Sequence, residues 1–177
     1  PNVFRGFYDG APEFGATLHW IAEEFDTGNI LSQKAAPLPD EVTVENIVPV
    51  WRSLIAETIA EGIERALAGD PGRVQDESLA SYGAAFTEEE RWLSLTESQR
   101  VLQCKMTGLS FDNPNRIKVM VEHEPFKVLG LELLSPQTIT AKPGDCVERD
   151  KDILTVQVAD GLVKLQVEPL VTVSDSI

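Results

Sequence analysis

The triplet Asp26-Thr27-Gly28 carries the side chain in this sequence that is best suited to acid–base chemistry, and His19 precedes the aspartate by seven residues. A carboxylate in such a triplet can share a proton with a second carboxylate, or it can hold an imidazolium and relay protons. It can also be part of an ordinary turn, because aspartate side chains bond to nearby backbone groups. The sequence outside the triplet distinguishes among these interpretations.

The first interpretation, an aspartic protease, finds little support. Such enzymes need two carboxylates that share a proton, so they carry two triplets or dimerise around one. This chain has a single Asp-Thr-Gly. Glu23 and Glu24 stand before it, where that class has apolar residues, and Asn29 follows it, where Ser or Ala is usual. We therefore favour the other interpretations.

Composition and charge narrow the class of protein. The 177 residues are 42% hydrophobic and 25% charged, as in ordinary globular proteins. The net charge of −14 repels phosphate backbones, so no broad nucleic-acid surface is expected. No apolar run is long enough to cross a bilayer, and no secretory signal is visible. We therefore expect no membrane partner. Cys104 and Cys146 lack metal-ligand spacing, so we expect no metal site and two free thiols in the cytoplasm. A disulfide between them is the alternative.

Elements of an α/β unit surround the triplet. Residues 16–21 and 29–34 favour two short strands, with Asp-Thr-Gly on their connection. A helix is predicted from Thr43 up to the stop signal at residues 69–72, and Pro49 indicates either a kink or the start of its main part. Apolar residues recur at every fourth position of this helix, which predicts a face packed on the sheet. These residues are Ile47, Trp51, Ile55, Ile59, Ile63 and Leu67.

The second half of the chain changes to a period of two. Two capping boxes, from Thr87 to Glu90 and from Thr96 to Gln99, predict two short helices, the second ending near Gly108. Five strands are predicted after them, at residues 116–121, 126–134, 145–148, 153–158 and 162–167. We expect an α/β fragment over residues 1–70, a linker over 71–85, and a β-rich, OB-like barrel module with leading short helices over 86–177.

Three motifs stand out in the first part of the chain: Pro1-x-x-x-Arg5-Gly6, Gly15-Ala-Thr-Leu-His19 and Phe25-Asp26-Thr27-Gly28-Asn-Ile30-Leu31. They resemble the second half of the Rossmann-like catalytic domain of the methionyl-tRNA formyltransferase family. The spacing from His19 to Asp26 is similar to that between the histidine and the catalytic aspartate of the related glycinamide ribonucleotide enzymes. The stretch from Ala141 to Leu170 resembles the family's C-terminal barrel. Two separated matches in the same order cover nearly the whole chain.

The resemblance implies a transferase of one-carbon metabolism that moves a formyl group from 10-formyltetrahydrofolate to a primary amine. Asp26 would be catalytic, because a carboxylate can hold the imidazolium that stabilises the developing oxyanion and can relay protons. The other residues of the matching motifs would contact folate or the amine substrate. They are Arg5, Gly6, His19, Thr27 and Gly28.

The chain also departs from the family. The family's catalytic Asn and His lie upstream of the motif that begins at Pro1, so we expect these 177 residues alone not to catalyse formyl transfer. Only residues 7–14 separate Gly6 from Gly15, where the family has a longer segment.

The acceptor and the oligomeric state stay open. The family favours methionyl-tRNA, whereas residues 86–177, with 10 Lys and Arg against 15 Asp and Glu, favour a small acceptor such as an amino-sugar nucleotide. A non-catalytic binding module is the remaining alternative.

Overall fold

A computed structural model describes residues 2–135 and 141–170; Pro1, the first residue of the Arg5-Gly6 motif, lies outside these ranges. Contacts within the chain define two units. Unit 1 comprises Ala11–Gly83, and unit 2 combines Asn2–Gly10 with the described residues from Ala84 onward. The domain boundaries drawn from the sequence at residues 70 and 86 stay predictions, and each unit is described by itself.

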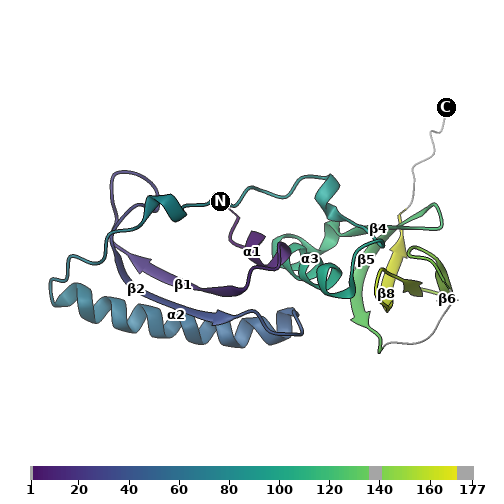
Figure 1. Ribbon diagram of the computed structural model, residues 1–177, viewed down its shortest axis with the longest axis horizontal. Coiled ribbons are helices and arrows are strands. Elements are labelled where there is room, and N and C mark those ends of the chain that lie inside the picture. Colours follow the sequence, from purple (N-terminus) through teal and green to yellow (C-terminus); the bar gives the residue numbers. More distant parts are fainter. Residues whose placement is uncertain (1, 136–140, 171–177) are drawn as a thin grey trace. The chain divides into compact units, whose positions relative to one another are not determined.

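Unit 1 is a two-stranded antiparallel sheet with one long helix. Strands β1 (Glu13–His19) and β2 (Ile30–Pro37) pair with a register shift between Leu18 and His19. Helix α2 (Val44–Leu67) runs along this hairpin (Figure 1). Both strands and the helix confirm the predicted elements, and the Asp-Thr-Gly triplet lies on the connection between the strands, as predicted.

Helix α2 begins where its capping residue predicts. The Thr43 side chain accepts a hydrogen bond from the backbone N–H of Asn46 at 3.2 Å, which satisfies one of the free donors of the first turn. Pro49 lies inside the helix and not at its start. Of the two alternatives that Pro49 indicated, the start of the main part of the helix is therefore wrong.

The face that α2 turns toward the hairpin agrees with the predicted one at the N-terminal end of the helix and departs from it toward the C-terminal end. Trp51 donates its indole N–H to the Gly15 carbonyl at 2.9 Å, and Gly62 lies so close to Leu18 that a Cβ would meet its side chain at 2.4 Å. Of the predicted stripe, Ile47 is buried, but its C-terminal members are exposed. A four-residue step advances about 400° around a helix, so a stripe with that spacing drifts about 40° per step off the packed face. The exposed members are Ile55, Ile59, Ile63 and Leu67.

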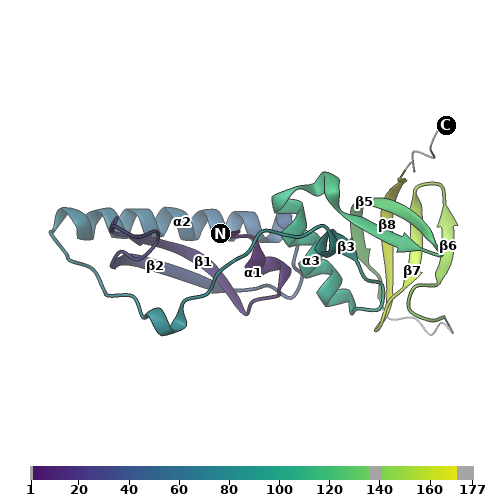
Figure 2. The same cartoon turned by 90° about the horizontal axis from the view of Figure 1, so that it is seen from above.

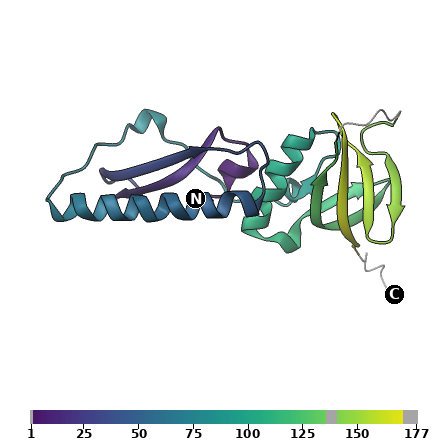
Figure 3. The ribbon, with the colours of Figure 1, turned by 90° about the horizontal axis from the view of Figure 1, so that it is seen from below.

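Unit 2 places two helices beside a mixed six-stranded sheet (Figures 2 and 3). The helices are α1 (Arg5–Tyr8) and α3 (Gln99–Asp112). The strand order is β3-β4-β5-β8-β7-β6, in which β3 and β4 are parallel and the other pairs antiparallel. The strands are β3 (Trp92–Leu93), β4 (Lys118–Val121), β5 (Glu124–Leu133), β6 (Cys146–Asp150), β7 (Ile153–Gln157) and β8 (Leu162–Pro169).

The core of unit 2 is apolar and continuous. Buried side chains of α3 and of the inward positions of the strands form one cluster, because alternate strand residues point to the same side of a sheet. The five strands predicted from the period of two are confirmed as β4 to β8, with ends that differ by a few residues. Among the described residues the strand order is open between β3 and β6, so closure into a barrel stays a prediction.

The two capping boxes fold differently from their predictions. Thr87 and Glu90 exchange side-chain and backbone hydrogen bonds as a capping box does, but only one 3-10 turn follows, at Glu89–Arg91. At the second box the helix starts later than predicted, because Ser98 and not Thr96 accepts from the backbone N–H of Val101. Helix α3 then continues to Asp112, beyond the predicted end. Further 3-10 turns lie at Glu77–Leu79 and Pro114–Arg116.

Within residues 2–135 and 141–170, no helix combines the length and the hydropathy needed to span a bilayer.

Candidate functional site

The connection between β1 and β2, residues 20–29, brings His19 and Asp26 together. Its ends are joined by a hydrogen bond from the backbone N–H of Trp20 to the Asn29 carbonyl, at 2.9 Å. Across this loop the His19 Nε2 lies 3.6 Å from the Asp26 Oδ1. That distance is too long for a hydrogen bond but is within ion-pair range when the imidazole is protonated.

The neighbouring backbone fixes which nitrogen of His19 faces the carboxylate. The Nδ1 atom lies 2.8 Å from the Trp20 carbonyl oxygen. A carbonyl only accepts, so Nδ1 carries the proton and Nε2 is left facing Asp26. The side chain of Asp26 is 74% exposed, against 27% for His19. Its Oδ2 has no partner among the described residues, so this oxygen is available to a group from outside.

The backbone of the loop explains the triplet itself. Asp26 has a φ of +59°, a conformation in which aspartate is tolerated better than most residues. Thr27 donates its hydroxyl to the Glu24 carbonyl at 3.1 Å, inside the loop. Gly28 passes so close to Trp20 that a Cβ on it would lie 1.6 Å from the Trp20 carbonyl oxygen, the atom that accepts from His19. Only glycine fits there.

We expect Gly28→Ala to lower the free energy of unfolding of unit 1 by about 1–3 kcal/mol, because the added methyl group must displace the Trp20 carbonyl. Urea unfolding followed by tryptophan fluorescence measures it, with Trp20 and Trp51 as the probes in unit 1 and Trp92 as the probe in unit 2. The control is Gly130→Ala, where a Cβ would make ordinary contacts at 3.6 Å and no loss of stability is expected. Equal stability of the two variants would contradict the close approach.

A second segment, residues 70–75, follows helix α2 and contacts the 20–29 loop. Most of this segment was predicted to be part of a linker. Trp20 donates its indole N–H to the Asp70 carbonyl at 3.0 Å, and Asn29 donates its side-chain amide to the Pro71 carbonyl at 2.9 Å. Ile30 and Arg73 exchange two backbone hydrogen bonds, at 2.8 and 2.9 Å.

Gln75 makes the most direct contact with the triplet. Its Nε2 donates to the carbonyls of Asp26 and Gly28, at 2.7 and 2.6 Å. No local pattern around Gln75 indicates this contact, because its partners lie 47 and 49 residues away.

Asp70 closes the same segment on α2. It accepts from the Arg65 guanidinium at 2.8 Å and from the Gly72 backbone N–H at 2.8 Å. The Gly72 N–H and the Arg65 guanidinium keep the pKa of the Asp70 carboxyl below its ordinary value. The 20–29 loop is thus connected, through residues 70–75, to the end of a regular helix.

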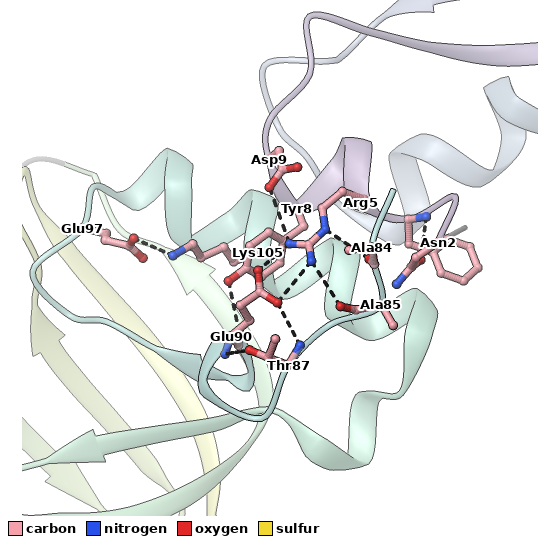
Figure 4. A network of polar contacts seen from close by, with 11 residues as sticks. Asn2, Arg5, Tyr8, Asp9, Ala84, Ala85, Thr87, Glu90, Glu97 and Lys105 are labelled. Carbon is pink, nitrogen blue, oxygen red and sulfur yellow. Dashed lines mark hydrogen bonds and ion pairs between the residues drawn. The ribbon is translucent and has the colours of Figure 1, made fainter. Parts of the chain in front are cut away.

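The remaining predicted site residues, Arg5 and Gly6, belong to α1 in unit 2 (Figure 4). Gly6 is exposed. The Arg5 guanidinium binds Glu90 through both of its terminal nitrogens, at 2.6 and 3.1 Å, and its side chain is 18% exposed. Arg5 therefore has an internal partner, and its contact with folate stays a prediction.

The surroundings of the Arg5–Glu90 pair complete this polar network. Ala84 and Ala85 offer backbone carbonyls to the guanidinium at 3.4 Å, and the Phe86 ring lies 4.6 Å from its central carbon. Hydrogen bonding to Arg5 lowers the pKa of Glu90 to about 2, and the pKa of Arg5 is raised by the same contact. The pair is an ion pair at neutral pH.

No group of three or more His, Cys, Asp or Glu side chains with the geometry of a metal site occurs in the part of the chain that the structure describes. The two cysteines are free thiols, Cys104 buried and Cys146 half-buried.

Comparison with known proteins gives relatives at both the sequence and the structure level. The methionyl-tRNA formyltransferase of Moorella thermoacetica is 28% identical in an alignment of 170 residues that covers 94% of this chain and 53% of that protein. The methionyl-tRNA formyltransferase of Streptococcus uberis is 25% identical in an alignment that covers 98% of this chain and 56% of that protein. The chain spans about half the length of the curated relatives it matches. No family model matches it.

A solved structure with a similar fold is HypX from Aquifex aeolicus in complex with tetrahydrofolic acid, with a TM-score of 0.70 and 18% identity, over 93% of this chain and 29% of that one. Another is the N-formyltransferase from Helicobacter canadensis in complex with folinic acid and dTDP-3-aminofucose, with a TM-score of 0.69 and 16% identity, over 94% of this chain and 60% of that one. At these identities the likeness concerns the fold.

Proposed function

We propose that this chain, whose resemblance to the methionyl-tRNA formyltransferase family is borne out by its curated relatives, is the C-terminal half of a folate-dependent formyltransferase. The proposal rests above all on one observation: an exposed carboxylate, that of Asp26, lies beside an imidazole of fixed orientation on a closely held loop. In the whole enzyme, unit 1 would complete the catalytic domain, and the sheet of unit 2 would be the counterpart of the family's C-terminal barrel.

Formyl transfer to a primary amine requires a base close to the amine nitrogen and to the formyl carbon. When bound, 10-formyltetrahydrofolate supplies the formyl group: the amine nitrogen bonds to its carbon, the bond from that carbon to N10 breaks, and a proton passes from the amine to N10. Asp26 would take part in this proton transfer and would hold an imidazolium from the preceding half through Oδ2. The Nε2 of His19 lies 3.6 Å from the other oxygen.

The residues present suit such a ligand. A folate ring system carries N–H groups, and the 20–29 loop offers a carboxylate oxygen without a partner among the described residues. Ile21 and Phe25 on the same loop are almost fully exposed, so apolar surface is available next to the carboxylate. Polar acceptors beside apolar side chains are the usual lining of a site for a small ring-containing ligand.

The acceptor has two candidates. Methionyl-tRNA is favoured by the names of the curated relatives. An amino-sugar nucleotide is favoured by the net charge of −14, since a tRNA-binding surface gains most of its affinity from neutralised phosphates. We propose methionyl-tRNA as the first acceptor to test and the amino-sugar nucleotide as the second.

We expect the full-length protein that contains this chain to formylate one of these acceptors from 10-formyltetrahydrofolate. The assay incubates the purified protein with the donor and either methionyl-tRNA or a dTDP-linked amino sugar, and detects the formylated product by mass spectrometry. Folate binding without a product from any primary amine would contradict the enzyme and favour the non-catalytic module. For tRNA, the slope of binding affinity against salt concentration measures how many phosphates the protein neutralises.

A further inference from the structure

We propose that Gln75 is a positioning residue for Asp26: its side-chain amide fixes the turn that aims the carboxylate, although it does not touch the carboxylate. The activity part of this inference rests on the proposed function. The structural part does not, because it concerns contacts within unit 1.

The geometry singles out this amide. Its Nε2 carries two N–H groups, and they reach the two carbonyls on either side of Thr27, those of Asp26 at 2.7 Å and Gly28 at 2.6 Å. Both donors of one nitrogen are therefore used on the triplet. The contact holds the Asp26–Thr27 and Gly28–Asn29 peptide planes, and the first of these is bonded to the Cα that carries the Asp26 side chain.

The backbone conformation of Asp26 requires stabilisation from its surroundings, which the Gln75 amide provides. A φ of +59° is sparsely populated by residues other than glycine and persists where the surroundings impose it. Thr27 stabilises the turn from within, through its bond to Glu24. Gln75 stabilises it from outside the loop, and it is part of a segment that Asp70 attaches to α2 through Arg65. The triplet is thus held by a segment that is itself attached to a regular helix.

The rate of the reaction should depend on the position of the Asp26 carboxylate, because its neighbour His19 lies beyond hydrogen-bond distance. Asp26 Oδ1 lies 3.6 Å from His19 Nε2, so a small rotation of the turn would break or tighten this approach. A catalytic group displaced by about 1 Å can lose about 100-fold in rate. A residue that fixes the turn should therefore act on kcat, while the binding of the amine acceptor is left largely to other groups.

The test compares Gln75→Leu and Gln75→Glu with the wild type. Leucine removes both donors, and glutamate keeps the shape but places a carboxylate against two carbonyls. In the full-length enzyme we expect each variant to lower kcat by about 100-fold and to change KM of the acceptor little. Because a protonated carboxyl regains one donor, the rate of Gln75→Glu relative to the wild type should rise as the pH is lowered, whereas that of Gln75→Leu should not.

The chain offers a matched control in unit 2. The Nε2 of Gln157 donates to the carbonyls of Val158 and Gly161, at 2.8 and 3.0 Å, so one amide again spans two carbonyls of a turn. Gln157→Leu removes the same kind of contact from a turn without a site residue. We expect its kcat to equal that of the wild type. An equal loss of kcat in both leucine variants would mean that Gln75 contributes stability only, and would overturn the inference.

Hydrogen exchange on the 177-residue chain supplies a readout that does not need activity. In Gln75→Leu the backbone amides of Trp20 and Ile30, which bond to Asn29 and Arg73, should exchange about 10-fold faster, with α2 amides unchanged. If the wild-type enzyme forms no product, the proposed function fails and this measurement alone decides whether Gln75 fixes the turn. Unchanged exchange at both amides would overturn the inference even if formyl transfer is established.

Discussion

Replacing Asp26 by asparagine in the full-length enzyme should abolish formyl transfer, by about 1,000-fold or more in kcat, while unfolding is almost unaffected. Asparagine has the same shape and tolerates the φ of +59°, so the turn can keep its conformation. The change removes the negative charge that would hold an imidazolium and accept a proton. Because the Asp26 side chain is 74% exposed, the melting temperature should shift by less than about 4 °C.

The control for this variant is Glu24→Gln, which removes one negative charge from the same loop. Glu24 takes part in the turn through its backbone carbonyl, which accepts from Thr27, and this contact does not depend on the side chain. We expect its kcat to be close to that of the wild type. The comparison separates the loss of a specific carboxylate from a change in the field of an acidic surface. A large loss of stability in Asp26→Asn with activity intact would make Asp26 a purely structural turn residue.

Local signals predicted most of the fold. The period of two placed β4 to β8, and the cap at Thr43 placed the start of α2, because both depend on residues close in sequence. The packed face of α2 was not predictable in the same way. Ile59 and Ile63 fit the apolar period yet are exposed, whereas the contact with β1 depends on Gly62, whose missing side chain gives no apolar signal.

In the candidate site, too, some features follow from local sequence and others from packing between distant residues. His19 and Asp26 were predicted from motifs, and the short connection between two paired strands brings them together. The distant contacts of the predicted site residues could not be predicted, because Gln75 reaches the triplet across 47 to 49 residues, and Arg5, in unit 2, pairs with Glu90 across 85. Such pairs follow from packing, and no pattern in either partner's neighbourhood indicates them.

A second large effect is expected from breaking the ion pair of Arg5 and Glu90. We expect Glu90→Gln to destabilise unit 2 by about 3 kcal/mol, because a largely buried guanidinium loses its nearest anion. The anion that remains, the Asp9 carboxylate, lies 3.9 Å away, and the two backbone carbonyls lie at 3.4 Å. Hydrogen exchange of the α3 amides measures the change, since α1 packs on α3 through the stacked rings of Phe4 and Phe111. Because the double variant Arg5→Met with Glu90→Gln leaves no unpaired charge, it should recover part of the loss. Additive losses in the double variant would mean that the two side chains are not coupled.

The pH dependence of unfolding gives this pair an independent test. Hydrogen bonding to Arg5 lowers the pKa of Glu90 from 4.5 to about 2, so the folded state binds this proton less readily than the unfolded chain. The contribution of Glu90 is therefore complete above pH 4.5 and is lost as the pH falls toward 2; the shift corresponds to at most about 3 kcal/mol. In Glu90→Gln this group no longer titrates, so the stability of unit 2 should fall less steeply between these pH values than in the wild type. Parallel pH profiles would show that the ion pair of Arg5 and Glu90 contributes nothing to the folded state.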